Sequence, residues 1–258
     1  MHANVQPVVA RFLLGTAGEV KQMITLAAVA DLHCYADLTG AIQRMLSSVN
    51  DEADILVLPG DLTLGGDKAE ADILIGELRH VRIPIVAVLG NHDFQSNAER
   101  EILSRLRARG VIVLDGTSVM LQVNGQTVGF AGVKGFCGGF SPYIIAEFGE
   151  PSLKDFVRAG HQEVAKLQSS MASLRGDFRV VVLHYAPVRE TVIGEPPELH
   201  PFLGSSELRE PLDRYGADVI FHGHAHFGSR FGRTERGIPV YNVALPVVRR
   251  YMIYQLGE

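Results

Sequence analysis

The chain has 258 residues, of which 47% are hydrophobic and 21% are charged, a composition that can bury a sizeable core. Its formal net charge is −5, so it has no general electrostatic attraction for nucleic-acid polymers or anionic membranes. This charge disfavours a DNA nuclease, which needs a basic track for the phosphate backbone, whereas bound metal ions can still draw a small anionic substrate into a cleft.

Strands and helices alternate in the first half of the chain. Apolar runs predict strands at residues 24–30, 55–58 and 85–89. Apolar residues then recur at helical spacing over residues 38–49, 73–78 and 96–109, with Gly110 as a stop signal. Ser96, followed three residues later by Glu99, is typical of a capping box. This alternation predicts a parallel sheet with helices packed outside it.

The middle of the chain has a different pattern. Residues 111–133 indicate short strands without helices, and Asn124-Gly125 predicts a tight hairpin. Residues 134–149 are rich in glycine and aromatic side chains, which fits either a surface connection or a loop that covers a substrate. A long helix is then expected from Ser152, as its cap, to Gly176.

Further strands are predicted at residues 180–183, 219–221 and 238–240, and a proline-rich loop at 195–201 is expected near the site. No linker divides the chain, so we expect one domain of residues 1–258, with residues 1–22 as a candidate accessory extension. No apolar run approaches the ~18 residues of a spanning helix. The two cysteines, Cys34 and Cys137, do not demand a disulfide, and we expect a cytoplasmic protein.

Five of these six strands run into Asp, His or Asn residues, and the sixth runs into Tyr241-Asn242. The five sequences are Asp31-Leu32-His33, Gly60-Asp61, Gly90-Asn91-His92-Asp93, His184 and His222-Gly223-His224-Ala225-His226. Residues i and i+2 of an extended segment point the same way, and the carboxyl ends of neighbouring strands converge on one crevice. The sequence therefore predicts a metal centre at the edge of a sheet.

The candidate ligands mix carboxylate, amide and imidazole groups and include no thiolate. They are Asp31, His33, Asp61, Asn91, His184, His224 and His226. Such donors suit Mn, Fe, Zn, Ni or Co better than a Ca site or a structural zinc site. Seven ligands are too many for one tetrahedral ion and fit two ions that share a bridging carboxylate. We interpret Cys34 and His222 as packed residues, and Asn242 either as a turn residue or as one that closes the site.

The ordered motifs Asp-x-His, Gly-Asp, Gly-Asn-His-Asp, His and Gly-His-x-His resemble those of the calcineurin-like metallophosphoesterase superfamily, over residues 31–226. The overall pattern is most similar to that of small bacterial phosphoesterases, which include class III cyclic-nucleotide phosphodiesterases. The resemblance implies an α/β fold, a four-layer αββα sandwich of two mixed β-sheets with helices outside. It also implies two divalent or mixed-valence transition-metal ions.

By the same resemblance each motif residue has a role. Asp31, His33 and His226 would hold one ion; Asn91, His184 and His224 would hold the other; Asp61 would bridge them. His92 would act beside the leaving group, as a general acid or as an electrostatic stabiliser. The implied reaction is hydrolysis of a phosphomonoester or phosphodiester by a metal-bridging hydroxide. A non-catalytic metal-binding scaffold of the same fold is the alternative. We expect a small phosphate-ester substrate and no membrane partner, and a homo-oligomer is compatible with the sequence.

The sequence departs from the protein Ser/Thr phosphatase branch, which carries Gly-Asp-x-x-Asp-Arg-Gly. Leu64 stands where that branch has the acid that orients its catalytic histidine, and the arginine is missing. A protein phosphatase is therefore disfavoured. Because Leu64 replaces the acid, Asp93 and Asp67 are the candidates to orient His92. If neither does so, His92 would act by stabilising charge rather than by donating a proton.

Overall fold

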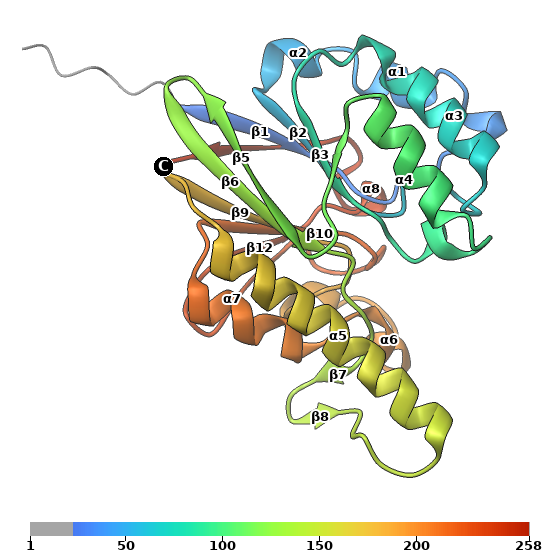
Figure 1. Cartoon of the computed structure of the whole chain (residues 1–258), viewed down its shortest axis with the longest axis vertical. Helices are drawn as coiled ribbons and strands as arrows, with labels where there is room; N and C mark the ends of the chain where they lie inside the picture. Colours follow the sequence, from blue (N-terminus) through green and yellow to red (C-terminus); the bar gives the residue numbers. More distant parts are fainter. Residues whose placement is uncertain (1–22, 258) are drawn as a thin grey trace, which may run out of the picture.

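The computed structural model describes residues 23–257, so the predicted accessory extension at residues 1–22 lies outside the described residues. Two mixed β-sheets pack face to face, and helices cover both outer faces (Figure 1). This arrangement confirms the α/β fold with four layers in the order αββα. Among residues 23–257, no helix is both long enough and apolar enough to span a membrane.

The first sheet contains the strands predicted from the N-terminal half, in the order β13-β1-β2-β3-β4. Strands β1 to β4 run parallel, and β13 pairs antiparallel with β1. Their bounds are β1 Ile24–Ala28, β2 Ile55–Pro59, β3 Ile85–Val88, β4 Ile112–Val113 and β13 Met252–Leu256. The outer face is covered by α1 Ala41–Met45, α2 Val49–Glu52, α3 Lys68–Glu77 and α4 Glu99–Ala108, with short 3-10 turns η1 Ala36–Leu38, η2 Leu78–His80 and η3 His92–Phe94.

The second sheet has the order β11-β12-β10-β9-β6-β5. Its strands are β5 Thr117–Val123, β6 Gln126–Val133, β9 Phe178–Leu183, β10 Val219–His222, β11 Phe231–Arg233 and β12 Pro239–Asn242. The predicted hairpin joins β5 to β6, with Asn124 and Gly125 at φ of 50° and 75°. Helices α5 Pro151–Ser173 and α7 Arg209–Tyr215 pack on the outer face (Figure 1).

The core between the sheets is built from alternate residues of the central strands. Leu26 and Val57 of the first sheet meet Phe130, Val182 and Phe221 of the second, and all are fully buried. The intervening residues of the same strands pack against the helices instead, which is why these strands are apolar almost throughout. A shift of one residue in any strand would exchange the two faces, so the core fixes the strand register. It thereby fixes where each strand ends.

Three helix boundaries differ from the predictions. In place of one helix over residues 38–49, α1 covers residues 41–45 and α2 begins only at Val49, because the chain turns at Leu46 to Ser48. Ser96 does not cap α4: its hydroxyl donates to the carbonyl of Gly65, while the capping box belongs to α3, through Asp67 and Glu70.

Helix α5 likewise begins at Pro151 rather than after a cap at Ser152, because proline is suited to the first turn, where the missing N–H costs nothing.

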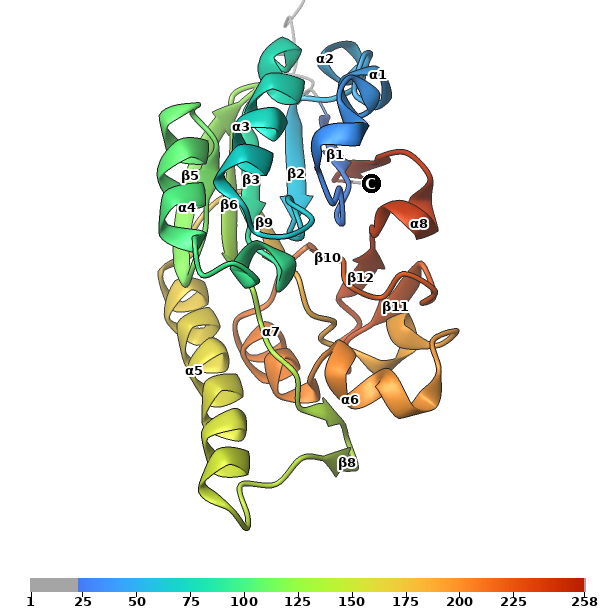
Figure 2. The same cartoon turned by 90° about the vertical axis from the view of Figure 1, so that its right-hand side faces the viewer.

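The connections on the second-sheet side form small elements around the strand ends (Figure 2). The glycine- and aromatic-rich segment contains β7 Gly139–Phe140 and β8 Tyr143–Ile144. The proline-rich loop contains η5 Pro197–Leu199 and α6 His200–Leu203. Nearby are η4 Arg189–Val192 and η6 Ser206–Leu208, whereas α8 Leu245–Val248, after β12, packs against the core of the first sheet.

Candidate metal centre

All seven predicted ligands lie together at the carboxyl ends of β1, β2, β3, β9 and β10. Four of them hold a left-handed backbone conformation: Asp31 at φ 58°, His33 at 41°, Asp61 at 47° and His224 at 70°. Each such residue costs of order 1–3 kcal/mol and persists only where the surrounding structure enforces it. Such a concentration of strained residues is typical of functional sites, and the sequence alone does not reveal it.

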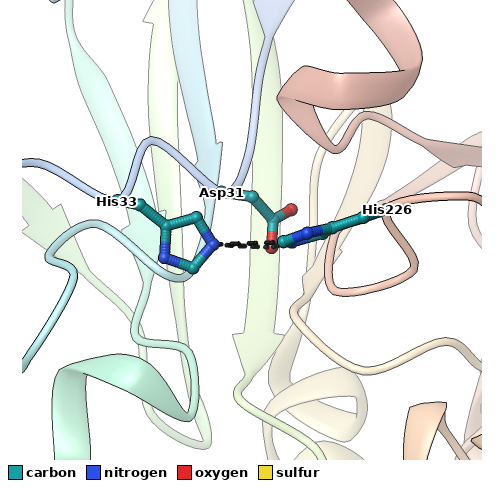
Figure 3. Close-up of side chains that lie close together, drawn as sticks. All are labelled: Asp31, His33 and His226. Carbon is teal, nitrogen blue, oxygen red and sulfur yellow. Dashed lines mark hydrogen bonds and ion pairs between the residues drawn. The ribbon is translucent and has the colours of Figure 1, made fainter.

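One group of ligand atoms consists of Asp31, His33 and His226, which face one another across the site (Figure 3). The Nε2 of His226 lies 3.1 Å from Oδ1 of Asp31 and 3.4 Å from Nε2 of His33. Burial lowers the pKa of His33, which favours its neutral form with a nitrogen lone pair. Two imidazole nitrogens and a carboxylate oxygen at these distances fit a bound cation, because a cation satisfies all three lone pairs at once.

The second group consists of Asp61, Asn91, His184 and His224. Nε2 of His184 lies 2.9 Å from Oδ1 of Asn91 and 3.3 Å from Oδ1 of Asp61. Its Nδ1 donates to the carbonyl of Pro59, so Nε2 is the atom available to a metal. Similarly, Nε2 of His224 donates to the carbonyl of Phe202 at 3.1 Å, which leaves Nδ1 free. Both ring orientations are thus fixed by backbone carbonyls.

Asp61 joins the two groups. Its side chain is 1% exposed; Oδ1 faces His184, and Oδ2 lies 3.8 Å from Nε2 of His33. Burial works to raise the pKa of Asp61, but the charge and hydrogen bonds of His184 and the N–H of His92 outweigh it and lower the pKa. Burial likewise opposes the charge of His184, yet Asp61 raises the pKa of that histidine to about 9. The charged His184 ring thus stabilises the Asp61 carboxylate, as a bound cation would.

Three glycines beside the ligands are required by space. A Cβ on Gly90 would lie 2.1 Å from Oδ1 of Asp61, one on Gly223 would lie 2.4 Å from Oδ2 of Asp31, and one on Gly60 would lie 2.5 Å from Nδ1 of His184. Gly60 also forms a sharp turn, with φ of +85°. A sharp turn is not the reason for Gly90, where the glycine lets a ligand side chain approach the backbone.

His92 lies at the edge of the same cluster. Its Nδ1 donates to the backbone carbonyl of Leu64 at 2.6 Å, and its Nε2 lies 4.0 Å from Oδ2 of Asp61. The side chain is 34% exposed, so Nε2 can meet both the cluster and a bound molecule. The residue that replaces the missing acid is therefore Leu64 itself, through its carbonyl oxygen rather than its side chain.

Asp93 and Asp67, the two acids that the sequence offers to orient His92, have other roles. Asp93 is fully buried and accepts hydrogen bonds from the N–H groups of Leu62, Thr63 and Gly90 and from the Thr63 hydroxyl. It joins the loop after β2 to the loop after β3 and so holds Asp61 and Asn91 in register. Burial, helped by the nearby charge of Asp61, raises the pKa of Asp93 to about 6. Asp67 caps α3.

The remaining polar residues near the site are structural. His222 is fully buried and bonded to the Gly223 carbonyl and the Thr191 hydroxyl, outside the cluster. Asn242 donates to the carbonyl of Ala225 and braces the loop that carries His224 and His226 from behind. Both cysteines are free thiols, and burial raises the pKa of Cys34 to about 12, which disfavours a thiolate ligand there.

This fold and this site match a known family. A family model described as calcineurin-like phosphoesterase matches residues 24–228. The chain therefore belongs to the calcineurin-like phosphoesterase family, whose members are in general metal-dependent phosphoesterases. The resemblance carried by the sequence motifs is thereby confirmed.

Individual relatives are more distant. YpbG, an uncharacterised protein of Bacillus subtilis (strain 168), is 26% identical over 217 residues, and the match covers 83% of this chain but only 65% of that protein. TT1561 of Thermus thermophilus superposes with a TM-score of 0.55 at 15% identity, covering 90% of this chain and 99% of that one. GAP50, the anchor in the inner membrane complex of Plasmodium, gives 0.55 at 13% identity, covering 87% and 72%. These two structures establish a shared fold alone.

Proposed function

We propose that the chain hydrolyses small phosphomonoesters or phosphodiesters with two transition-metal ions bound side by side. The observation that carries the proposal is the position of Asp61, whose two carboxylate oxygens face two separate groups of ligand atoms. A single tetrahedral ion takes only about four ligands, so it would not need the second group of ligand atoms. The net charge of −5 favours a small ester over a nucleic-acid polymer.

In this proposal Asp31, His33 and His226 hold one ion, Asn91, His184 and His224 hold the other, and Asp61 contacts both. The donor set suits Mn, Fe, Zn, Ni or Co. When bound, such ions lower the pKa of water from 15.7 toward ~7 and neutralise charge on the phosphoryl oxygens. The protein supplies the rest through rigid placement: strained backbone at four ligands and carbonyl bonds behind two imidazoles.

His92 acts on the leaving group. Its Nδ1–H is committed to the Leu64 carbonyl, so proton donation has to occur from Nε2, on the doubly protonated ring. The same positively charged ring can instead stabilise negative charge on the leaving oxygen without giving up its proton. Both roles need the geometry that the Leu64 carbonyl fixes.

An assay of the purified full chain tests the proposal against the scaffold alternative. With Mn or another of the named metals supplied, we expect turnover of at least one ester in a panel of small phosphomonoesters and phosphodiesters. Chelation should abolish turnover and re-addition of metal should restore it, with circular dichroism unchanged as a check on folding. A metal-loaded, folded protein that hydrolyses no member of the panel would favour the scaffold.

A further inference from the structure

A hollow on the side of the second sheet is lined by three arginines. Its volume is about 240 Å³, and Arg189 from η4, Arg209 from α7 and Arg233 from β11 all reach its wall. Figure 2 shows β11 and α6 on this side of the molecule. Such a grouping is unexpected on a chain with a net charge of −5.

Two of the three arginines form no ion pair among residues 23–257. Arg209 pairs with Glu235 at 2.8 Å and with Asp213 at 3.7 Å, whereas neither Arg189 nor Arg233 pairs with an acid. Arg233 donates one bond to the carbonyl of Gly237, and within residues 23–257 the side chain of Arg189 makes neither a hydrogen bond nor an ion pair. Three arginines and three acids thus surround the hollow, and the guanidinium groups of Arg189 and Arg233 keep donors that no acid accepts.

The remaining polar groups of the wall also present donors. The Ser206 hydroxyl oxygen accepts from the N–H of Ser141, and that of Thr234 accepts from the N–H of Ile238. Neither bond uses the hydroxyl hydrogen, so each hydroxyl can still donate. Guanidinium and hydroxyl donors around one space match an oxyanion, and a volume below the ~300–1,000 Å³ of drug-sized pockets suits a single small group.

The hollow is connected to the metal-binding loop. The η4 turn that begins at Arg189 also carries Thr191, whose hydroxyl is bonded to His222 at 2.8 Å. Glu195, six residues after Arg189, accepts from the N–H of Phe227, the residue that follows His226. Arg189 also lines two adjoining hollows that extend to Glu195 and His200. Hydrogen bonds at Thr191 and Glu195 thus link the segment that carries Arg189 to the strand and loop that present His224 and His226.

We infer that this hollow is an anion-binding site, separate from the metal centre, that takes a phosphate or carboxylate group through Arg189 and Arg233. The anion is either a second phosphate group of the substrate or a separate small effector. The first alternative rests on the proposed function. The binding itself requires no turnover. The two inferences can therefore fail independently.

Equilibrium dialysis of the metal-loaded full chain with labelled inorganic phosphate tests the site. The wild type should bind two phosphates per chain, one at the metals and one at the arginines. The double variant Arg189→Gln/Arg233→Gln should bind one, because losing two charge-assisted contacts weakens the second site at least ~10-fold. The matched control Arg230→Gln/Arg236→Gln alters exposed arginines on either side of β11, outside the hollow, and should bind two.

Kinetics then identify the source of the anion. If the site takes a second phosphate of the substrate, the double variant should raise KM for glucose 1,6-bisphosphate about tenfold while kcat and the KM for glucose 1-phosphate stay constant. If it takes a separate effector, neither KM should change although the second phosphate is lost. Equal numbers of bound phosphates in the wild type and the double variant would overturn the inference, whether or not the metal centre binds one.

Discussion

Replacing Asp61 with asparagine should reduce turnover by at least ~10³-fold, a loss of about 4 kcal/mol of transition-state stabilisation. Asparagine keeps the shape of the side chain, can still accept the N–H of His92, and tolerates the left-handed backbone found at φ 47°. It removes the one negative charge that faces both groups of ligands. Both metals should therefore bind more weakly in a protein that remains folded.

Elemental analysis of the purified variant, together with its circular dichroism and melting temperature, measures this effect. Asp67→Asn is the matched control: it changes an acid six residues away that caps α3, and asparagine is an equally good cap. The control should keep metal content and rate. An Asp61→Asn protein with a full complement of metal and a near-normal rate would contradict the bridging role.

The replacement of His92 with alanine should lower the rate by ~10²–10⁴-fold while metal content and substrate affinity are retained. His92 contacts the cluster from its edge, at 4.0 Å from Asp61, and Asn91 already supplies the ligand at that turn. The loss should be largest for alkoxide leaving groups, which need a proton. It should shrink for p-nitrophenyl phosphate, whose leaving group departs as a stable anion.

The rate is measured as kcat across esters that differ in leaving-group pKa. His161→Ala, on the exposed surface of α5, is the control for loss of an imidazole and should leave every rate unchanged. Equal losses for His92→Ala across the series would exclude proton donation. They would support charge stabilisation by a ring held on the Leu64 carbonyl.

The sequence predicts the fold well where the determinants are local. Strand ends at Asp31, Asp61, Asn91 and His184 follow from apolar runs that are buried on both faces, and the hairpin at Asn124-Gly125 follows from turn chemistry. The pairing of β13 with β1 joins residues more than 200 positions apart, and no local pattern specifies it. Ser96 has the residue type of a cap, but its hydroxyl instead donates to the Gly65 carbonyl in another loop.

The candidate site, like the fold, is predicted by the sequence only in part. Side-chain identities at strand ends indicate which residues meet, but the groups that orient them are mostly backbone carbonyls, at Pro59, Leu64 and Phe202. Every residue has a carbonyl, so no sequence pattern distinguishes these three. The close approach of Asp61 to Gly90 is equally hidden, because it depends on how two neighbouring loops pack.

We propose that two metal ions share Asp61, and anomalous scattering from crystals of the metal-loaded full chain tests this sharing. We expect two peaks within ~4 Å of each other, one among Asp31, His33 and His226 and one among Asn91, His184 and His224, with a carboxylate oxygen of Asp61 bound to each. A single peak, or none, in crystals grown with excess metal would contradict the account.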